Sequence, residues 1–95
     1  MLIKITESAE QGLLSIADYL VENDATEAER IVRAIIDAAY SLRQLPKRGR
    51  PGRVTGTLEL LVPNLPYLLV YTVMPDEIRI VQVLHQRQKW PLRQP

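Results

Sequence analysis

The spacing of hydrophobic positions divides the chain into a helical half and a strand-rich half. Apolar residues recur every three or four positions from Ala9 to Leu20, which is typical of one face of a helix. A second and longer stripe with the same spacing predicts a helix from about Glu27 to Arg43. Asn23-Asp24 interrupts the spacing between the two stripes. We therefore expect two antiparallel helices joined by a short connection.

Capping residues mark the start of both predicted helices. Thr6 and Ser8 are each suited to cap the first helix, because a hydroxyl oxygen can accept a free backbone N–H there. The segment from Thr26 to Glu29 matches a capping box, in which the Thr26 oxygen accepts an N–H and Glu29 reaches back. The sequence therefore predicts that Thr26 caps the second helix.

Strands are predicted at both ends of the chain. Alternating residues over 2–6 predict a short first strand, and runs over 57–62, 67–74 and 77–85 predict three more, separated by proline-containing turns. The short connections between the last three favour antiparallel pairing. The expected order is β-α-α-β-β-β. This is an α+β fold with a helical hairpin packed on one face of a small, mainly antiparallel sheet.

Length and composition favour one domain without a bound metal. We expect residues 1–95 to form a single domain, in which 86–95 are a basic C-terminal tail. The chain has no cysteine and one histidine, which excludes a disulfide scaffold and a site with several histidine ligands, so we expect no metal and no cofactor. No apolar run approaches the roughly 18 residues of a membrane span. Lys4 comes too early for a signal peptide. We expect a cytoplasmic protein that does not contact a membrane.

The last two predicted strands are apolar on both of their faces. One layer of helices covers only one face of a sheet, and a sheet with a wet face should alternate between apolar and polar residues. The run 67–74 is apolar throughout apart from one threonine and the tyrosine hydroxyls. We therefore expect a partner polypeptide to cover the remaining apolar surface. Shielding by strand twist, loops and the tail is the alternative.

Charge is divided unevenly between the two halves. Residues 1–46 hold four Lys or Arg against eight Asp or Glu, whereas residues 47–95 hold eight against three. This indicates a basic surface for an anionic partner, or a solvated surface with segregated signs. Pro46–Arg53 holds four cations, two prolines and two glycines and is predicted to be a basic loop. Within it, Arg50 and Arg53 can each grip a phosphate or carboxylate, or remain solvated.

Two further features could carry function. His85 stands at a strand end and titrates near neutrality, so it is either a general acid or base or a structural residue. Glu59 and Tyr71 are possible second groups for RNA cleavage, although no spacing brings them to His85. In the tail, cations stand beside Trp90, as in nucleic-acid sites, and Trp90 is equally suited to be a hydrophobic peg.

Several motifs occur in an informative order and spacing. They are Arg50-Pro51-Gly52-Arg53, Glu59-Leu60-Leu61-Val62-Pro63 running into Leu65-Pro66-Tyr67, Val70-Tyr71, and Val83-Leu84-His85-Gln86-Arg87-Gln88. With the predicted element order, they resemble the RelE/ParE superfamily of small bacterial toxins over nearly the whole chain. The pattern Val-Leu-His-x-Arg-x-x-Trp-Pro, from Val83 to Pro91, is most similar to the ParE-like branch.

The resemblance implies a toxin of a type II toxin–antitoxin system. Such a toxin is neutralised by a cognate antitoxin whose C-terminal segment wraps it, which gives a hetero-oligomer. The complex binds operator DNA only indirectly, through the antitoxin. The ParE-like branch implies inhibition of DNA gyrase, and so of replication, without catalysis. The alternative is a RelE-like ribosome-dependent mRNA endoribonuclease.

The resemblance also implies where the partners bind. We expect the target at residues of the C-terminal half: Arg50, Arg53, Arg87, Lys89 and Trp90. We expect the antitoxin on the helical hairpin and the sheet: Leu13, Leu20, Ile31, Ile35, Tyr71 and Val81. No residue is expected to be catalytic except His85 in the ribonuclease alternative. The absence of a tyrosine beside His85 and the sparse cations of the helices count against that alternative.

Overall fold

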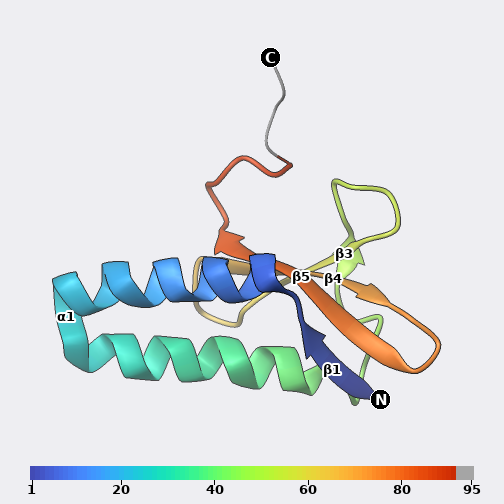
Figure 1. Cartoon of the computed structure of the whole chain (residues 1–95), viewed down its shortest axis with the longest axis horizontal. Coiled ribbons are helices and arrows are strands. Elements are labelled where there is room, and N and C mark those ends of the chain that lie inside the picture. The colour runs from blue at the N-terminus through green and yellow to red at the C-terminus, as the bar shows by residue number, and fades with distance from the viewer. Residues whose placement is uncertain (92–95) are drawn as a thin grey trace.

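A helical hairpin lies against one face of a five-stranded sheet (Figure 1). The computed structural model describes residues 1–91, so residues 92–95 at the end of the predicted tail lie outside the described residues. The strands follow the order β1-β5-β4-β3-β2, in which only β1 and β5 are parallel neighbours. The predicted α+β fold is confirmed. The elements are β1 (Leu2–Ile5), α1 (Glu7–Ser41), β2 (Arg50–Pro51), β3 (Leu58–Leu61), β4 (Tyr67–Val73) and β5 (Glu77–His85).

The element α1 is bent at Asp24, which divides it into the two predicted antiparallel helices (Figure 1). Asp24 has an extended backbone, and its Oδ1 accepts hydrogen bonds from the N–H groups of Thr26 at 3.1 Å and Glu27 at 3.2 Å. The expectation that Thr26 caps the second helix is therefore wrong. The aspartate two residues earlier takes this place because its short carboxylate reaches the free N–H groups of the first turn.

The first helix begins as predicted and is tied directly to the sheet. Thr6 Oγ1 accepts from the N–H of Ala9 at 3.2 Å and donates to the carbonyl of Ile80 in β5 at 2.9 Å. Gly12 then lies so close to β5 that a Cβ in its place would stand 2.3 Å from the carbonyl oxygen of Val83. Glycine at this position is what allows the helix to pack directly on the strand backbone.

The main core lies between the helices and the sheet. It joins one face of β4 and β5 to the inner faces of both helices. Its largest fully buried side chains include Ile35 from the second helix, the C-cap residue Leu42, and Leu69, Tyr71, Ile78 and Ile80 from the sheet.

A β-bulge in β5 changes which side chains face the helices. Val70 pairs with Gln82 and Tyr71 pairs with Ile80, so Val81 is an extra residue in β5. The alternation therefore shifts by one position after Ile80. Ile78, Ile80 and Val83 join the main core, whereas Val81 and Leu84 lie on the opposite face. This bulge explains why the strand does not alternate cleanly in the sequence.

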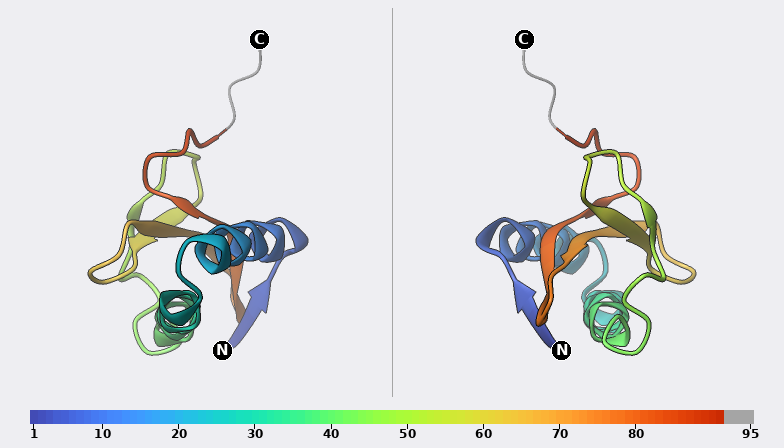
Figure 2. Two further views of the ribbon diagram at one scale, coloured as in Figure 1. Left: turned by 90° about the vertical axis from the view of Figure 1, so that its left-hand side faces the viewer. Right: turned by 90° about the vertical axis from the view of Figure 1, so that its right-hand side faces the viewer.

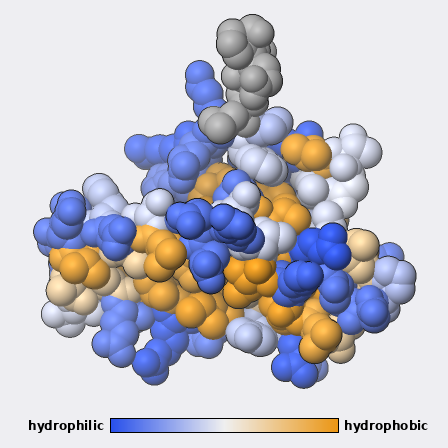
Figure 3. Space-filling model, in the orientation of Figure 1, coloured by the Kyte–Doolittle hydropathy of each residue, from blue (hydrophilic) through white to orange (hydrophobic). Residues whose placement is uncertain are grey.

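The opposite face of the sheet carries a second buried cluster. Leu68, Val70 and Leu84 are 3%, 0% and 4% exposed, and Val81 and Trp90 pack against them. The expectation that a partner must cover this face is therefore wrong at its centre, because the chain and its tail already bury it. Exposed large apolar side chains lie mainly on the helices and β1, where Figure 3 shows hydrophobic surface between hydrophilic side chains. On these two elements they are Leu2, Ile5, Leu14, Tyr19, Val21, Ile36 and Tyr40.

The remaining strand predictions agree with the structure to within one residue at each end. β5 has the predicted bounds, β4 ends one residue earlier, and β3 is one residue shorter at both ends. The predicted basic loop contains the two-residue strand β2, which pairs with β3 at the sheet edge. Proline is tolerated there because an edge strand leaves one row of its N–H groups without a partner. Within residues 1–91, no helix is both long and apolar enough to cross a bilayer.

Candidate functional site

Four arginines line one open pocket beside β3, on the side of the sheet away from the helices. The pocket has a volume of about 570 Å³. It brings together three of the predicted target-binding residues, Arg50 and Arg53 from the basic loop and Arg87 from the tail. In Figure 2 the connection from β2 to β3, which continues the basic loop, and the tail rise together on that side of the sheet. We call this the arginine pocket; its lining residues are Arg48, Gly49, Arg50, Arg53, Glu59, Leu60, Leu61, Leu68, Gln86 and Arg87.

A buried carboxylate lies in the wall of the arginine pocket. Glu59 is 3% exposed, its Oε2 accepts from the backbone N–H of Arg53 at 2.9 Å, and its Oε1 lies 3.6 Å from Arg53 Nε. A buried charge is costly unless it is paired in this way. Glu59 is therefore bound to Arg53, and the sequence interpretation of Glu59 as a possible partner for His85 is wrong. The position of Glu59 as the one acid in the apolar run of β3 was the signal that could have indicated its pairing with a basic residue.

Tyr71 of β4 holds the basic loop in place through its hydroxyl. Its hydroxyl donates to the carbonyl of Pro46 at 2.8 Å and accepts from the N–H of Gly49 at 2.9 Å. Burial raises the pKa of the Tyr71 phenol. A Cβ on Gly49 would stand 2.8 Å from this hydroxyl, so glycine is needed for the close approach. Tyr71 therefore fixes the first part of the basic loop, from Pro46 to Gly49, where the residues lining the arginine pocket begin.

The predicted antitoxin-binding residues fall into two groups. Ile35 and Tyr71 are 1% and 0% exposed in the core, so they offer no surface to a partner and that part of the prediction is wrong. They are buried because the centre of an apolar helical stripe, and the middle of a central strand, face the chain's own core. The others are half-buried: Leu13, Leu20, Ile31 and Val81.

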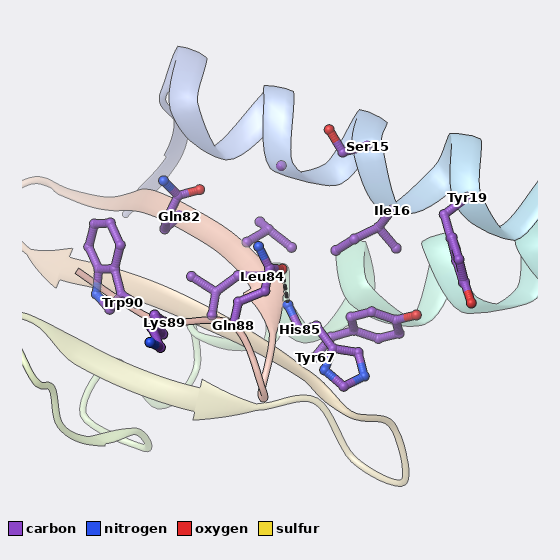
Figure 4. Close-up of a pocket in the computed structure, with 12 residues that line it drawn as sticks. Ser15, Ile16, Tyr19, Tyr67, Gln82, Leu84, His85, Gln88, Lys89 and Trp90 are labelled. Atoms are coloured by element: carbon purple, nitrogen blue, oxygen red, sulfur yellow. Dashed lines mark hydrogen bonds between the residues drawn. The ribbon is translucent and has the colours of Figure 1, made fainter. Parts of the chain in front are cut away.

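His85 lines a second pocket, between the first helix and the tail (Figure 4). This pocket has a volume of about 520 Å³ and is mainly apolar. The His85 ring meets the Tyr67 ring edge to face, with centroids 5.6 Å apart, and His85 Nδ1 accepts from the N–H of Arg87 at 3.1 Å. The neutral ring therefore carries its proton on Nε2. Burial raises the pKa of the Tyr67 phenol.

His85 and the arginines do not share a pocket. No residue within 1–91 lines both pockets. Glu59 and Tyr71 do not hydrogen-bond to His85, because their polar atoms bind Arg53 and the basic loop. In the same range, no group of three or more His, Asp or Glu side chains is placed to hold a metal ion. The structure thus places His85 apart from the pocket in which the arginines would hold a phosphate.

The two remaining predicted target-binding residues lie in the second pocket. Lys89 and Trp90 line it, next to His85 (Figure 4). Trp90 packs on the second buried cluster, so the hydrophobic-peg alternative is the one that the structure supports. Its carbonyl accepts a long hydrogen bond of 3.5 Å from Arg53 Nη1, which links the tail to the basic loop.

The fold and the order of these motifs define the class, a RelE/ParE superfamily toxin, and comparisons with known proteins agree. The family model described as the ParE toxin of type II toxin–antitoxin systems, parDE, matches residues 3–90. The chain belongs to the ParE toxin family and is the toxin of a type II toxin–antitoxin system. The resemblance predicted from the sequence is thereby confirmed.

Relatives and solved structures support this assignment. The chain is 36% identical over 89 residues to Y4kP, a candidate toxin of Sinorhizobium fredii, covering 94% of this chain and 92% of the relative. It is also 36% identical over 73 residues to the toxin RelE2 of Caulobacter vibrioides, covering 77% and 81%. The chromosomal ParDE system of P. aeruginosa matches with a TM-score of 0.82 and 27% identity, over 90% and 95% of the two chains. The toxin–antitoxin complex RelBE2 of Mycobacterium tuberculosis shares the fold, with a TM-score of 0.65 and 23% identity over 88% and 95%.

Proposed function

We propose that this ParE family toxin inhibits DNA gyrase, and so replication, by binding rather than by catalysis. The observation that carries the proposal is the separation of His85 from the arginine pocket. Cleavage of RNA by its own 2′-hydroxyl needs a base, an acid and a cation at one phosphate. Here Glu59 and Tyr71, the candidate second groups, are bound to Arg53 and the basic loop instead.

The arginine pocket is the proposed target surface. Arg50, Arg53 and Arg87 converge on it from the loop and the tail, on the side of the sheet that the helices leave free (Figure 2). Guanidinium groups bind carboxylates and phosphates through paired hydrogen bonds. Such a surface supports binding to gyrase in its cleaved-DNA state, which would stall the enzyme there. Lys89 and Trp90 extend the proposed surface around the tail.

The helical layer is the proposed antitoxin surface. Leu13, Leu20 and Ile31 are half-buried there, and the exposed Leu14 and Ile36 add apolar area. An amphipathic helix of the antitoxin would lay its apolar face on this layer. Matches to solved toxin–antitoxin complexes support such a partner. The complex would be a cytoplasmic hetero-oligomer that binds operator DNA through the antitoxin, and Val81 would contact an added extended segment.

One observation favours a second candidate function. The relative at 36% identity over 73 residues is named a RelE2 toxin, which supports a RelE-like ribosome-dependent mRNA endoribonuclease. His85 would be its catalytic residue.

Two assays on purified toxin separate these functions. We expect loss of supercoiling by gyrase, with mRNA intact in a translation-coupled cleavage assay. Arg87→Ala should raise the toxin concentration for half inhibition about tenfold, as expected for a contact worth about 1.4 kcal/mol. His85→Ala should leave inhibition unchanged, and Arg33→Ala, which removes an exposed arginine from the helical layer, is the matched control. Unaffected gyrase together with mRNA cleavage that His85→Ala abolishes would overturn the proposal.

A further inference from the structure

Glu59 is the one charged residue that is buried among those the structure describes. It lies in β3 directly opposite Arg50 of β2, in the wall of a pocket lined by four arginines. Its carboxylate lowers the net positive charge of that pocket by one, which works against attraction of an anion. A buried carboxylate also costs free energy to remove from water. Both costs indicate that Glu59 contributes something other than charge to the arginine pocket.

The contacts of Glu59 indicate what that contribution is. Its two oxygens face the backbone N–H and the Nε of one residue, Arg53. The Arg53 side chain is 39% exposed, so without this partner its guanidinium would be free to turn into solvent. The loop on either side is already fixed, because the N–H of Gly52 donates to the carbonyl of Thr57 at 2.8 Å. Glu59 therefore adds a backbone contact at Arg53 to a loop that is already closed, and its second oxygen sets the direction of the guanidinium.

Arg53 in turn joins the loop to the tail. Its Nη1 reaches the carbonyl oxygen of Trp90 at 3.5 Å, while Trp90 packs its ring on the second buried cluster. We infer that Glu59 is a positioning residue: it aims Arg53 at the tail, so that the basic loop and the tail form one rigid target-binding surface. The statement about target binding rests on the proposed function, whereas the statement about the tail does not.

Tryptophan fluorescence tests the link in the toxin alone. Trp90 is the only tryptophan of the chain, so its emission reports the environment of the tail. We expect Glu59→Gln and Arg53→Ala to shift the emission to longer wavelength and to increase acrylamide quenching, each to a similar extent. Arg50→Ala, which changes a neighbouring arginine in the same loop, should leave the emission unchanged. Because Arg53 is partly exposed, its variant should fold even if Glu59→Gln does not. Unchanged Trp90 emission in folded Arg53→Ala would overturn the inference.

A double-mutant cycle tests the effect on the target. Each of Glu59→Gln and Arg53→Ala should raise the toxin concentration for half inhibition of gyrase about tenfold. The double variant should be no weaker than Arg53→Ala alone, because Glu59 acts through Arg53. Glu59→Gln combined with Arg50→Ala should instead show additive losses. Additive losses for the pair Glu59 and Arg53 would overturn the positioning role. A wild-type toxin that leaves gyrase active would overturn the proposed function, and the fluorescence measurement would still decide the link to the tail.

Discussion

The Tyr71 hydroxyl shows how a single residue connects the core of this toxin to its functional loop. The ring is fully buried, and the hydroxyl satisfies the Pro46 carbonyl and the Gly49 N–H together. Removing the hydroxyl would leave both backbone groups without this partner, which typically costs about 1–3 kcal/mol. Because burial raises the pKa of Tyr71 above its ordinary value of 10.0, the same residue also links stability to pH.

We expect Tyr71→Phe to lower the free energy of unfolding near neutral pH and to reduce its loss in alkali. Above about pH 10 the unfolded chain loses the phenolic proton while the folded chain keeps it, so wild-type stability falls as pH rises through this window. Tyr71→Phe lacks the part of this alkaline loss of stability that comes from Tyr71. The part that comes from Tyr67, whose pKa is also raised, remains in the variant. Urea unfolding at about pH 8 and about pH 11 measures the difference. The control is Tyr40→Phe at an exposed tyrosine, and an alkaline loss in Tyr71→Phe equal to that of wild type would contradict the prediction.

The sequence indicated which residues would have a structural or functional role, but it did not indicate which residues they would bind or pack against. Thr6 could be named as one of two candidate caps, with Ser8, because a cap bonds its own helix within three residues. The partners of Glu59 and Tyr71 depend on how the basic loop folds back on the sheet, and no local sequence pattern encodes that path. Likewise, the spacing of apolar residues placed Ile35 on the apolar face of the second helix, but it did not show that Ile35 lies at the centre of the core.

At the scale of the elements, the bend at Asp24 determines the form of the hairpin. We expect Asp24→Ala to lower the free energy of unfolding by about 1 kcal/mol, because two N–H groups of the second helix lose their acceptor. Thr26→Ala should have a smaller effect, since Thr26 contributes its backbone N–H and not its hydroxyl to the cap. Urea unfolding of both variants measures the two effects. A larger loss in Thr26→Ala would instead support the capping box that the sequence indicated.

The sequence predicted where the strands begin and end, but it predicted only part of the pairing between strands. Proline and asparagine between the strands mark their ends, which is why the bounds agree to within one residue. The bulge at Val81 was hidden, because an inserted apolar residue in an apolar strand looks like two apolar faces. The pairing of β1 with β5 was also outside the reach of local patterns, since it joins the two ends of the chain.

At the scale of the molecule, the helical part of the proposed antitoxin surface and the proposed target surface lie on opposite sides of the sheet, and Val81 is the proposed antitoxin-binding residue that lies on the target side. The acidic N-terminal half forms the helical layer with its exposed apolar residues, and the basic C-terminal half forms the arginine pocket (Figure 2). The segregation of charge in the sequence therefore corresponds to a segregation in space.

We expect this separation to make the two binding activities independent. Leu14→Glu places a charge on the exposed apolar face of the helices and should weaken antitoxin binding about tenfold or more, while inhibition of gyrase is unchanged. Arg87→Glu should weaken inhibition of gyrase and leave antitoxin binding unchanged. Isothermal titration with the antitoxin and supercoiling assays measure the two activities. If either variant impaired both to the same extent while remaining folded, the surfaces would not be separate.

The parallel pairing of β1 with β5 has a consequence for biosynthesis. The N–H of Thr6, just after β1, donates to the carbonyl of Ile80, a residue 74 positions further along the chain. A nascent polypeptide still lacking its final strand has no place to dock its first one, and one edge of β4 has no strand to pair with. Contacts of such large sequence separation form late and slowly. The sheet can therefore close only when β5 is available for folding, so a partly synthesised chain that ends before β5 lacks the complete fold.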